Sequence, residues 1–210
     1  MYPIIKEIYQ NILYGQQNEI VINIHSALDS GFAAKTVLDE GMITAMAEIG
    51  RQFEAGECFI PEMLVAARAM QVGLTALKPS LNVDGVKATG IIAVGTVKGD
   101  LHDIGKNLVA LMLEGAGFDV MDLGADVDKE EFVAIAESVN IIALSAMLTT
   151  TMPNMKEIID ALTAAGKRSM VKVIVGGAPL NEAYAKQLGS DGYAPDASSA
   201  VTLTKSLLAI

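Results

Sequence analysis

The chain has 210 residues, 51% of them hydrophobic, and carries a formal net charge of −10 at pH 7. An acidic surface repels phosphate backbones and anionic lipid, so the composition excludes nucleic acid and membrane surfaces as expected partners. The single cysteine, Cys58, excludes an internal disulfide and a thiolate-rich zinc or iron–sulfur site, and we expect it to be a small buried apolar residue.

The first 78 residues predict helices throughout, because apolar residues recur at helical spacing in four segments. These segments are 4–13, 20–28, 35–54 and 61–78. Each segment has one apolar stripe, so we expect an antiparallel four-helix bundle over 1–78 with its methionines in the core. Lys6 and Glu7 interrupt the apolar core that a secretory signal would need, and no apolar run reaches membrane-spanning length. We therefore expect a cytoplasmic protein.

Proline, glycine and polar residues over 79–88 break the helical pattern and predict a linker that could act as a hinge. Beyond it, short apolar runs alternate with helical segments. The expected strands are 90–97, 120–123, 141–146, 171–175 and 192–194, and the expected helices are 102–114, 129–139, 152–165, 180–188 and 198–209. This alternation predicts an α/β domain over 89–210, with a flavodoxin-like (Rossmann-like) doubly wound parallel sheet of five strands.

A histidine between two aspartates follows the first of these strands. His102 lies between Asp100 and Asp103, at the strand end where open parallel sheets bind ligands. Asp100 can accept the proton on one imidazole nitrogen, which leaves the other nitrogen free to ligate a metal. One histidine cannot hold a bare metal ion, so the metal would arrive inside a macrocycle. The alternative is an ordinary surface or capping histidine, and His25, the only other histidine, is expected to face solvent.

Two further loops follow strands at the same sheet edge. Ser145 and the hydroxyl residues after it follow the third strand, where they could equally be an N-cap cluster. Gly176 and Gly177 follow the fourth strand, where backbone without side chains would let a bulky ligand enter between strand ends. Paired glycines are also common in ordinary turns. All three loops flank the crevice between the first and third strands, where the expected strand order changes direction.

The residues of these loops resemble the cobalamin-binding signature DxHxxG…SxL…GG. The matching residues are Asp100, His102, Gly105, Ser145, Gly176 and Gly177. The segment RQFEAGECFIPE, residues 51–62, is similar to the cap module of cobalamin-dependent methionine synthase. A two-domain chain of this kind, with no catalytic barrel, resembles the free-standing corrinoid proteins of anaerobic methyl-transfer systems for methanol, methylamines, betaines and aryl methyl ethers.

The resemblance implies a role for each matching residue. It implies that His102 is the lower axial ligand of the cobalt in cobalamin and that Asp100 is its hydrogen-bond partner. Ser145 would meet the displaced base and nucleotide tail of the cofactor, and Gly176 and Gly177 would line the slot for that tail. Other residues are implied to contact the cofactor or to cover its upper face. These are Phe53 and Ile60 in the cap, with Asp103, Ile104, Gly105, Met147, Thr149 and Thr151 in the loops.

Two positions depart from the family pattern. Met147 stands where the signature has leucine, which is a volume-conserving exchange. Thr151 stands where methionine synthase extends the histidine–aspartate pair with a serine, so a hydroxyl remains but a methyl group is added. Whether Thr151 continues the hydrogen-bond chain is left open by the sequence.

The function implied by the resemblance is that of a corrinoid methyl carrier, which is not catalytic alone. It would accept a methyl group on cob(I)alamin from a substrate held by a partner methyltransferase. A second methyltransferase would then take the group from methylcobalamin to tetrahydrofolate or coenzyme M, and a reductive activase would be a separate protein. Among methyl donors we lean to aryl methyl ethers, as in O-demethylase systems. The alternatives are the cobalamin-binding subunit of an adenosylcobalamin mutase, a class without the four-helix cap, and a cobalamin-sensing regulator, which would need a basic DNA-binding module.

Overall fold

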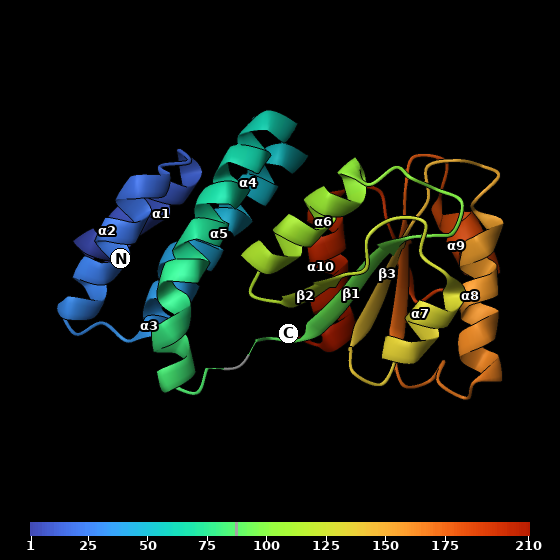
Figure 1. Ribbon diagram of the computed structural model, residues 1–210. Coiled ribbons are helices and arrows are strands. Elements are labelled where there is room, and N and C mark those ends of the chain that lie inside the picture. Colours follow the sequence, from blue (N-terminus) through green and yellow to red (C-terminus); the bar gives the residue numbers. More distant parts are fainter. Residues whose placement is uncertain (87) are drawn as a thin grey trace. The chain divides into compact units, whose positions relative to one another are not determined.

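The computed structural model describes residues 1–86 and 88–210, and Figure 1 shows the order of its helices and strands. The chain divides into two compact units. One unit comprises Met1–Ala88 with Glu114–Gly117, and the other comprises Thr89–Leu113 with Phe118–Ile210. In the part of the chain that the structure describes, no helix has both the length and the apolar character needed to cross a membrane.

The first unit is built from helices that each bury one apolar stripe. Its elements are α1 (Pro3–Leu13), α2 (Gln17–Asp29), α3 (Ala34–Thr36), the π-helical segment η1 (Val37–Ile43), α4 (Thr44–Glu54) and α5 (Ile60–Val83). Because α3, η1 and α4 follow one another without a break, the unit has the four helical rods expected from the sequence. Its core contains Met42, Met46, Met63 and Met70, each at most 2% exposed, and Cys58 is also buried. The expected burial of the methionines and of the cysteine is confirmed.

Helix α5 extends further than the sequence predicted, because it continues through Pro79 to Val83. Proline has no amide hydrogen, but Pro79 is exposed, so its ring displaces no core side chain and the helix loses one hydrogen bond. The helix ends instead before Gly85, whose φ of 65° allows the closing turn. The predicted linker over 79–88 is therefore helical up to residue 83, and it includes Lys87, which lies outside the described residues.

Five parallel strands form the sheet of the second unit. They are β1 (Ile91–Thr96), β2 (Asp119–Asp122), β3 (Ile141–Ser145), β4 (Lys172–Gly176) and β5 (Gly192–Ala194), in the spatial order β2-β1-β3-β4-β5. This order changes direction between β1 and β3, so the flavodoxin-like sheet expected from the sequence is confirmed.

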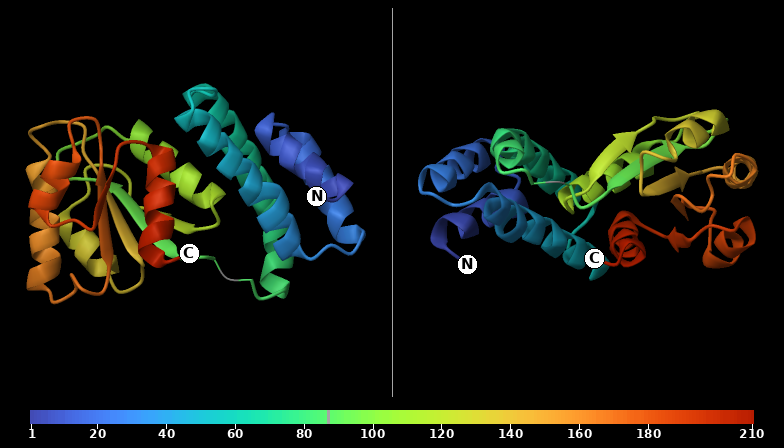
Figure 2. Two further views of the ribbon diagram at one scale, coloured as in Figure 1. Left: turned by 180° about the vertical axis from the view of Figure 1, so that it is seen from behind. Right: turned by 90° about the horizontal axis from the view of Figure 1, so that it is seen from below.

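Helices cover both faces of this sheet. They are α6 (Ile104–Gly115), α7 (Lys129–Ile135), α8 (Pro153–Ala164), α9 (Glu182–Leu188) and α10 (Ala197–Leu208). Buried residues of α7, α8 and α9 pack with Ile142 and Val173 of the sheet, and α6 and α10 lie on the opposite face (Figure 2). Helix α7 ends at Ile135 rather than at residue 139, because the Ser138 hydroxyl donates to the Ile135 carbonyl at 2.8 Å and competes with the helical bonds.

The last residues of the strands form a row at the carboxyl edge of the sheet. Thr96 of β1 is in register with Ser145 of β3, which is in register with Gly176 of β4. Because all strands are parallel, the loops that follow this row leave the sheet at the same edge. The three loops singled out in the sequence therefore start side by side.

We predict that Gly95→Ala destabilises the second unit. A Cβ atom at this position, one residue before the end of β1, would lie 2.7 Å from Cζ of Phe132, a fully buried ring. Overpacking of this kind lowers the free energy of unfolding by about 1–3 kcal/mol, which urea denaturation measures. The matched control is Gly105→Ala in α6, where a Cβ would meet nothing within 4 Å. Equal unfolding midpoints for the two variants would refute the packing explanation.

Candidate functional site

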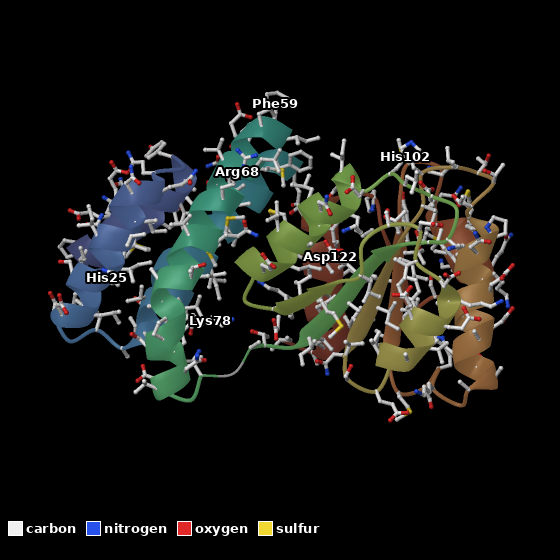
Figure 3. The ribbon with its side chains drawn as sticks, in the orientation of Figure 1. His25, Phe59, Arg68, Lys78, His102 and Asp122 are labelled. Atoms are coloured by element: carbon white, nitrogen blue, oxygen red, sulfur yellow. The ribbon has the colours of Figure 1, made fainter. Side chains whose placement is uncertain are left out.

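The segment from the bridge residue Val97 to α6, residues 98–103, carries His102 and is here called the His102 loop (Figure 3). It begins with a tight turn, in which the Asp100 amide donates to the Val97 carbonyl at 3.1 Å. Gly99 within this turn has a φ of 80°, which glycine adopts without the steric penalty of a side chain. The turn directs Asp100 into the protein, where its side chain is 0% exposed, and leaves the His102 side chain 55% exposed.

Asp100 and His102 form a hydrogen-bonded pair, as the spacing in the sequence indicated. The imidazole Nδ1 lies 2.7 Å from the Asp100 Oδ1 atom, and the backbone amide of His102 donates to the same oxygen at 3.1 Å. The carboxylate therefore fixes both the ring and the backbone of His102. With Nδ1 engaged, Nε2 on the exposed ring is available as a ligand atom.

The other oxygen of Asp100 joins this loop to the loop after β3. Its Oδ2 accepts hydrogen bonds from the amides of Met147 at 2.7 Å and Leu148 at 3.2 Å, and from the Thr151 hydroxyl at 2.7 Å. Burial alone raises the pKa of the Asp100 carboxyl, but the hydrogen bonds from Thr151, Met147 and His102 outweigh it and hold the pKa well below its usual range. An ionised carboxylate can only accept, so the proton of the imidazole lies on Nδ1 and the Nε2 lone pair is free.

Thr151 answers the question that the sequence left open. Its buried hydroxyl lies 2.7 Å from Asp100 Oδ2 and 2.9 Å from the Leu148 carbonyl oxygen, and the charged acceptor is the stronger of the two. Thr151 thus continues the hydrogen-bond chain from His102. Its extra methyl group would lie 3.6 Å from a Cβ at Gly99, an ordinary van der Waals distance, so threonine fits where the family pattern has serine.

Backbone atoms of neighbouring segments come close to both glycines at the end of β4, Gly176 and Gly177. Gly177 has a φ of 135°, and a Cβ there would lie 1.9 Å from the Ala146 carbonyl oxygen. A Cβ at Gly176 would lie 3.0 Å from the Ala194 carbonyl oxygen. The absence of a side chain at Gly177 lets the loops after β3 and β4 lie against each other, and its absence at Gly176 leaves room for the backbone of β5.

Exposed apolar side chains lie on the two loops that Asp100 connects and at the start of α6. This apolar rim consists of Leu101, Ile104, Met147 and Leu148, with Leu101 75% and Ile104 80% exposed. A cluster of exposed apolar residues on a soluble surface is typical of a binding site. An exposed imidazole nitrogen on a loop that carries such residues suits a broad ligand that has an apolar surface and a metal at its centre.

The other residues that the sequence predicted for the site lie on several different elements. Asp103 is exposed and starts α6, since its carbonyl accepts the Asn107 amide at 2.7 Å and its carboxylate accepts from the Asn107 side chain at 3.2 Å. Thr149 is exposed on the loop after β3. Phe53, half-buried near the end of α4, and Ile60, exposed at the start of α5, belong to the helical unit, and their part in the site stays a prediction.

Some contributors to the site were not identified from the sequence. The amides of Met147 and Leu148 bind Asp100 through the backbone, which no residue pattern reveals. Asp126, after β2, accepts from the Gly99 amide at 2.8 Å. Lys106 is buried in the first turn of α6, and a cation at this end of a helix is electrostatically unfavourable, which is a signal that the sequence did contain.

Comparison with known proteins gives matches over both units. A family model described as a B12 binding domain matches residues 90–202, and a second with the same description matches residues 4–78. The dimethylamine corrinoid protein 1 of Methanosarcina acetivorans is 44% identical to this chain over 176 residues, which cover 82% of this chain and 83% of that protein.

Two solved structures resemble the whole chain. A cobalamin-binding protein from Desulfitobacterium hafniense DCB-2 has a TM-score of 0.80 and 31% identity, and the match covers 97% of this chain and 98% of that chain. A chain of the methanol:cobalamin methyltransferase complex MtaBC from Methanosarcina barkeri has a TM-score of 0.87 and 29% identity, covering 98% of this chain and 80% of that chain. The fold is therefore shared with these proteins in both of its units.

The lowered pKa of Asp100 predicts how stability depends on pH. The pKa of the Asp100 carboxyl is near 3.8 in the unfolded chain and lower in the folded protein. Its contribution to the free energy of unfolding is therefore complete above the unfolded pKa and is lost as pH falls through the folded pKa. We expect the free energy of unfolding to fall more steeply from about pH 5 to pH 2 in the wild type than in Asp100→Asn. The control is Asp119→Asn, at an exposed aspartate of β2, which leaves Asp100 in place and should therefore keep a steeper fall than Asp100→Asn. Urea denaturation at each pH measures the slopes, and parallel curves for wild type and Asp100→Asn would contradict the assignment.

Proposed function

This chain belongs to the corrinoid proteins of methyltransferase systems, and we propose that it carries a methyl group between two partner methyltransferases. The observation that carries the proposal is the Asp100–His102 pair, in which a buried ionised carboxylate holds Nδ1 at 2.7 Å and frees Nε2 on an exposed ring. Bound cobalamin would supply a cobalt centre that accepts and releases the methyl group. The residues around His102 fit such a cofactor in donor type, exposure and polarity.

Each part of the site has a role in this proposal. His102 would ligate cobalt through Nε2, and Asp100 and Thr151 would orient its ring. The apolar rim would face the apolar surface of the corrin ring. Ser145 and Gly176, which are in register on neighbouring strands, would receive the nucleotide tail of the cofactor.

The hydrogen-bond chain also gives His102 a place to hold a proton. When Nε2 is not a ligand it can be protonated, and the resulting imidazolium faces the ionised carboxylate of Asp100 at hydrogen-bond distance. Thr151 and the two loop amides keep this carboxylate charged. Asp100 would therefore stabilise a proton on Nε2 whenever that nitrogen does not bind the cofactor.

We propose a methylamine as the methyl donor, because the relative reported above is named for dimethylamine. The preference for aryl methyl ethers has no comparable support. By analogy with the methanol:cobalamin methyltransferase complex, the donor substrate would be held by a partner methyltransferase rather than by this chain. Delivery to tetrahydrofolate or coenzyme M through a second methyltransferase, a separate reductive activase and a cytoplasmic location remain predictions. The helical unit, matched over residues 4–78, favours methyl carriage over the mutase alternative.

We predict that His102→Ala weakens cobalamin binding and changes the spectrum of the bound cofactor. The substitution removes the ligand nitrogen but keeps the glycine slot, so affinity should fall at least about tenfold rather than vanish. The measurement is the ultraviolet–visible spectrum after reconstitution with hydroxocobalamin and desalting. His25→Ala, at the exposed histidine of α2, is the matched control and should give the wild-type spectrum. A His102→Ala spectrum identical to wild type would exclude His102 as the ligand.

A second prediction tests the slot for the nucleotide tail. Gly176→Leu should block it and reduce the retention of hydroxocobalamin by more than about tenfold, because a buried ligand tail tolerates no added side chain. Gly176→Ala is the matched control, since its Cβ meets the same Ala194 carbonyl at 3.0 Å but occupies little of the slot. Equal retention by the two variants, with equal unfolding midpoints, would show that the tail binds elsewhere.

A further inference from the structure

The end of β2 and the connection after it, residues 122–127, contact the start of the His102 loop and the first turn of α6, which follows the loop. The first residue of this segment, Asp122, closes β2, and Figure 3 shows this residue labelled at the edge of the sheet. Its fifth residue, Asp126, lies against the start of the loop. An isolated parallel bridge between Val97 and Val127 joins the two segments where they leave the sheet. None of these residues belongs to the recognised cobalamin signature.

Asp126 binds the start of the His102 loop through both its backbone and its side chain. Its amide donates to the Asp100 carbonyl at 3.0 Å, and its Oδ1 accepts from the Gly99 amide at 2.8 Å. Its Oδ2 lies 3.5 Å from the Lys98 ammonium. Three successive residues of the loop are therefore tied to one aspartate, and one of the three is the partner of His102.

The backbone of Asp126 is strained. Its φ is 58°, in the left-handed region that residues with a side chain adopt at an energetic cost, although aspartate tolerates it better than most. This conformation lets the amide and the carboxylate of one residue reach two neighbouring loop residues. Strain that persists near a binding site is offset by surrounding contacts and commonly serves pre-organisation.

Asp122 holds the other end of the loop through Lys106. The Lys106 ammonium, whose side chain is 3% exposed, lies 2.5 and 2.6 Å from the two carboxylate oxygens of Asp122. Asp122 Oδ1 also accepts from the Gly124 amide at 2.8 Å, and the Gly124 carbonyl accepts from the Thr96 amide at 3.0 Å. The first turn of α6, which follows the loop directly, is thereby tied to the end of β2 and to β1.

We propose that Asp126 and Asp122 are positioning residues for His102, because Asp126 fixes the start of its loop and Asp122 fixes the helical turn that follows the loop. The positioning role itself does not depend on the proposed function. Only its consequence, tighter cobalamin binding, rests on that function. The His102 loop contains Gly99 and exposed residues, so without these two contacts it gains alternative conformations. Asp100 and His102 would then keep their 2.7 Å contact for only part of the time.

The test compares three variants of the 210-residue chain, two at Asp126 and one at Asp128. Asp126→Gly removes the acceptor for the Gly99 amide and relieves the backbone strain, so the chain keeps its fold. Asp126→Asn keeps an acceptor oxygen and tolerates the left-handed conformation, so it should rescue most of the loss. Asp128→Asn is the matched control, because Asp128 also pairs with Lys98, at 3.1 Å, but its carboxylate has no hydrogen bond to the loop backbone.

Two measurements separate this inference from the proposed function. In the protein without cofactor, hydrogen exchange at the Gly99 amide and the nitrogen NMR signal of the His102 ring report the loop and the Asp100 contact. In a titration with hydroxocobalamin, Asp126→Gly should weaken the affinity about tenfold and Asp128→Asn by less than about twofold. Of these three variants, only Asp126→Gly should show faster exchange at the Gly99 amide and a shifted signal of the His102 ring. An unchanged ring signal together with unchanged affinity would overturn the role of Asp126.

The contribution of Asp122 needs a variant that leaves no buried charge unpaired. Asp122→Asn combined with Lys106→Met removes both members of the pair and avoids the penalty of a lone buried ammonium. This double variant should show the same shift of the His102 ring signal, and wild-type values in both measurements would overturn the role of Asp122. If the wild type itself retains no hydroxocobalamin, the proposed function fails, whereas the measurements without cofactor still decide whether the two aspartates position His102.

Discussion

One buried carboxylate holds the site together. Asp100 accepts hydrogen bonds from its own loop through the ring and amide of His102, and from the next loop through two amides and the Thr151 hydroxyl. A fully buried charge is stable only when its hydrogen bonds are satisfied, and these five contacts satisfy it. The same contacts lower the pKa of the carboxyl, keep it ionised and so assign the imidazole proton to Nδ1. The imidazole nitrogen of His102 that stays free, Nε2, is thus determined by the buried side chain of Asp100.

The sheet supplies the geometry that Asp100 needs. Thr96, Ser145 and Gly176 are in register on three adjacent strands, so the loops after them leave one edge within reach of each other. Gly177 then brings the last of these loops against Ala146 with no side chain between them. The change of direction between β1 and β3 opens this edge to a ligand, as in other sheets of this order. The exposed residues of the apolar rim lie on this edge, and exposed apolar residues of this kind are typical of a binding surface.

Rigidity at the site comes from several segments at once. The loop after β3 holds the carboxylate of Asp100, and the connection after β2 holds the backbone around it through Asp126. A ligand residue on a loop gains precision when its supporting residues are themselves fixed. Gly99 permits the turn, but its conformational freedom would also permit disorder in the loop. The contacts from the neighbouring segments restrict that freedom.

The sequence by itself determined the two kinds of architecture, the positions of the five strands to within one residue, and the pairing of His102 with Asp100, because these depend on local periodicity and short spacing. It could not determine that α5 runs through Pro79, since tolerance of a proline depends on whether its ring is exposed. Nor could it show that Thr151 reaches Asp100 or that Asp126 holds Gly99, because these pairs are separated by 51 and 27 residues and meet only through strand register. Backbone donors such as the Met147 amide have no signature in the sequence at all, and only the tertiary structure decided where they point.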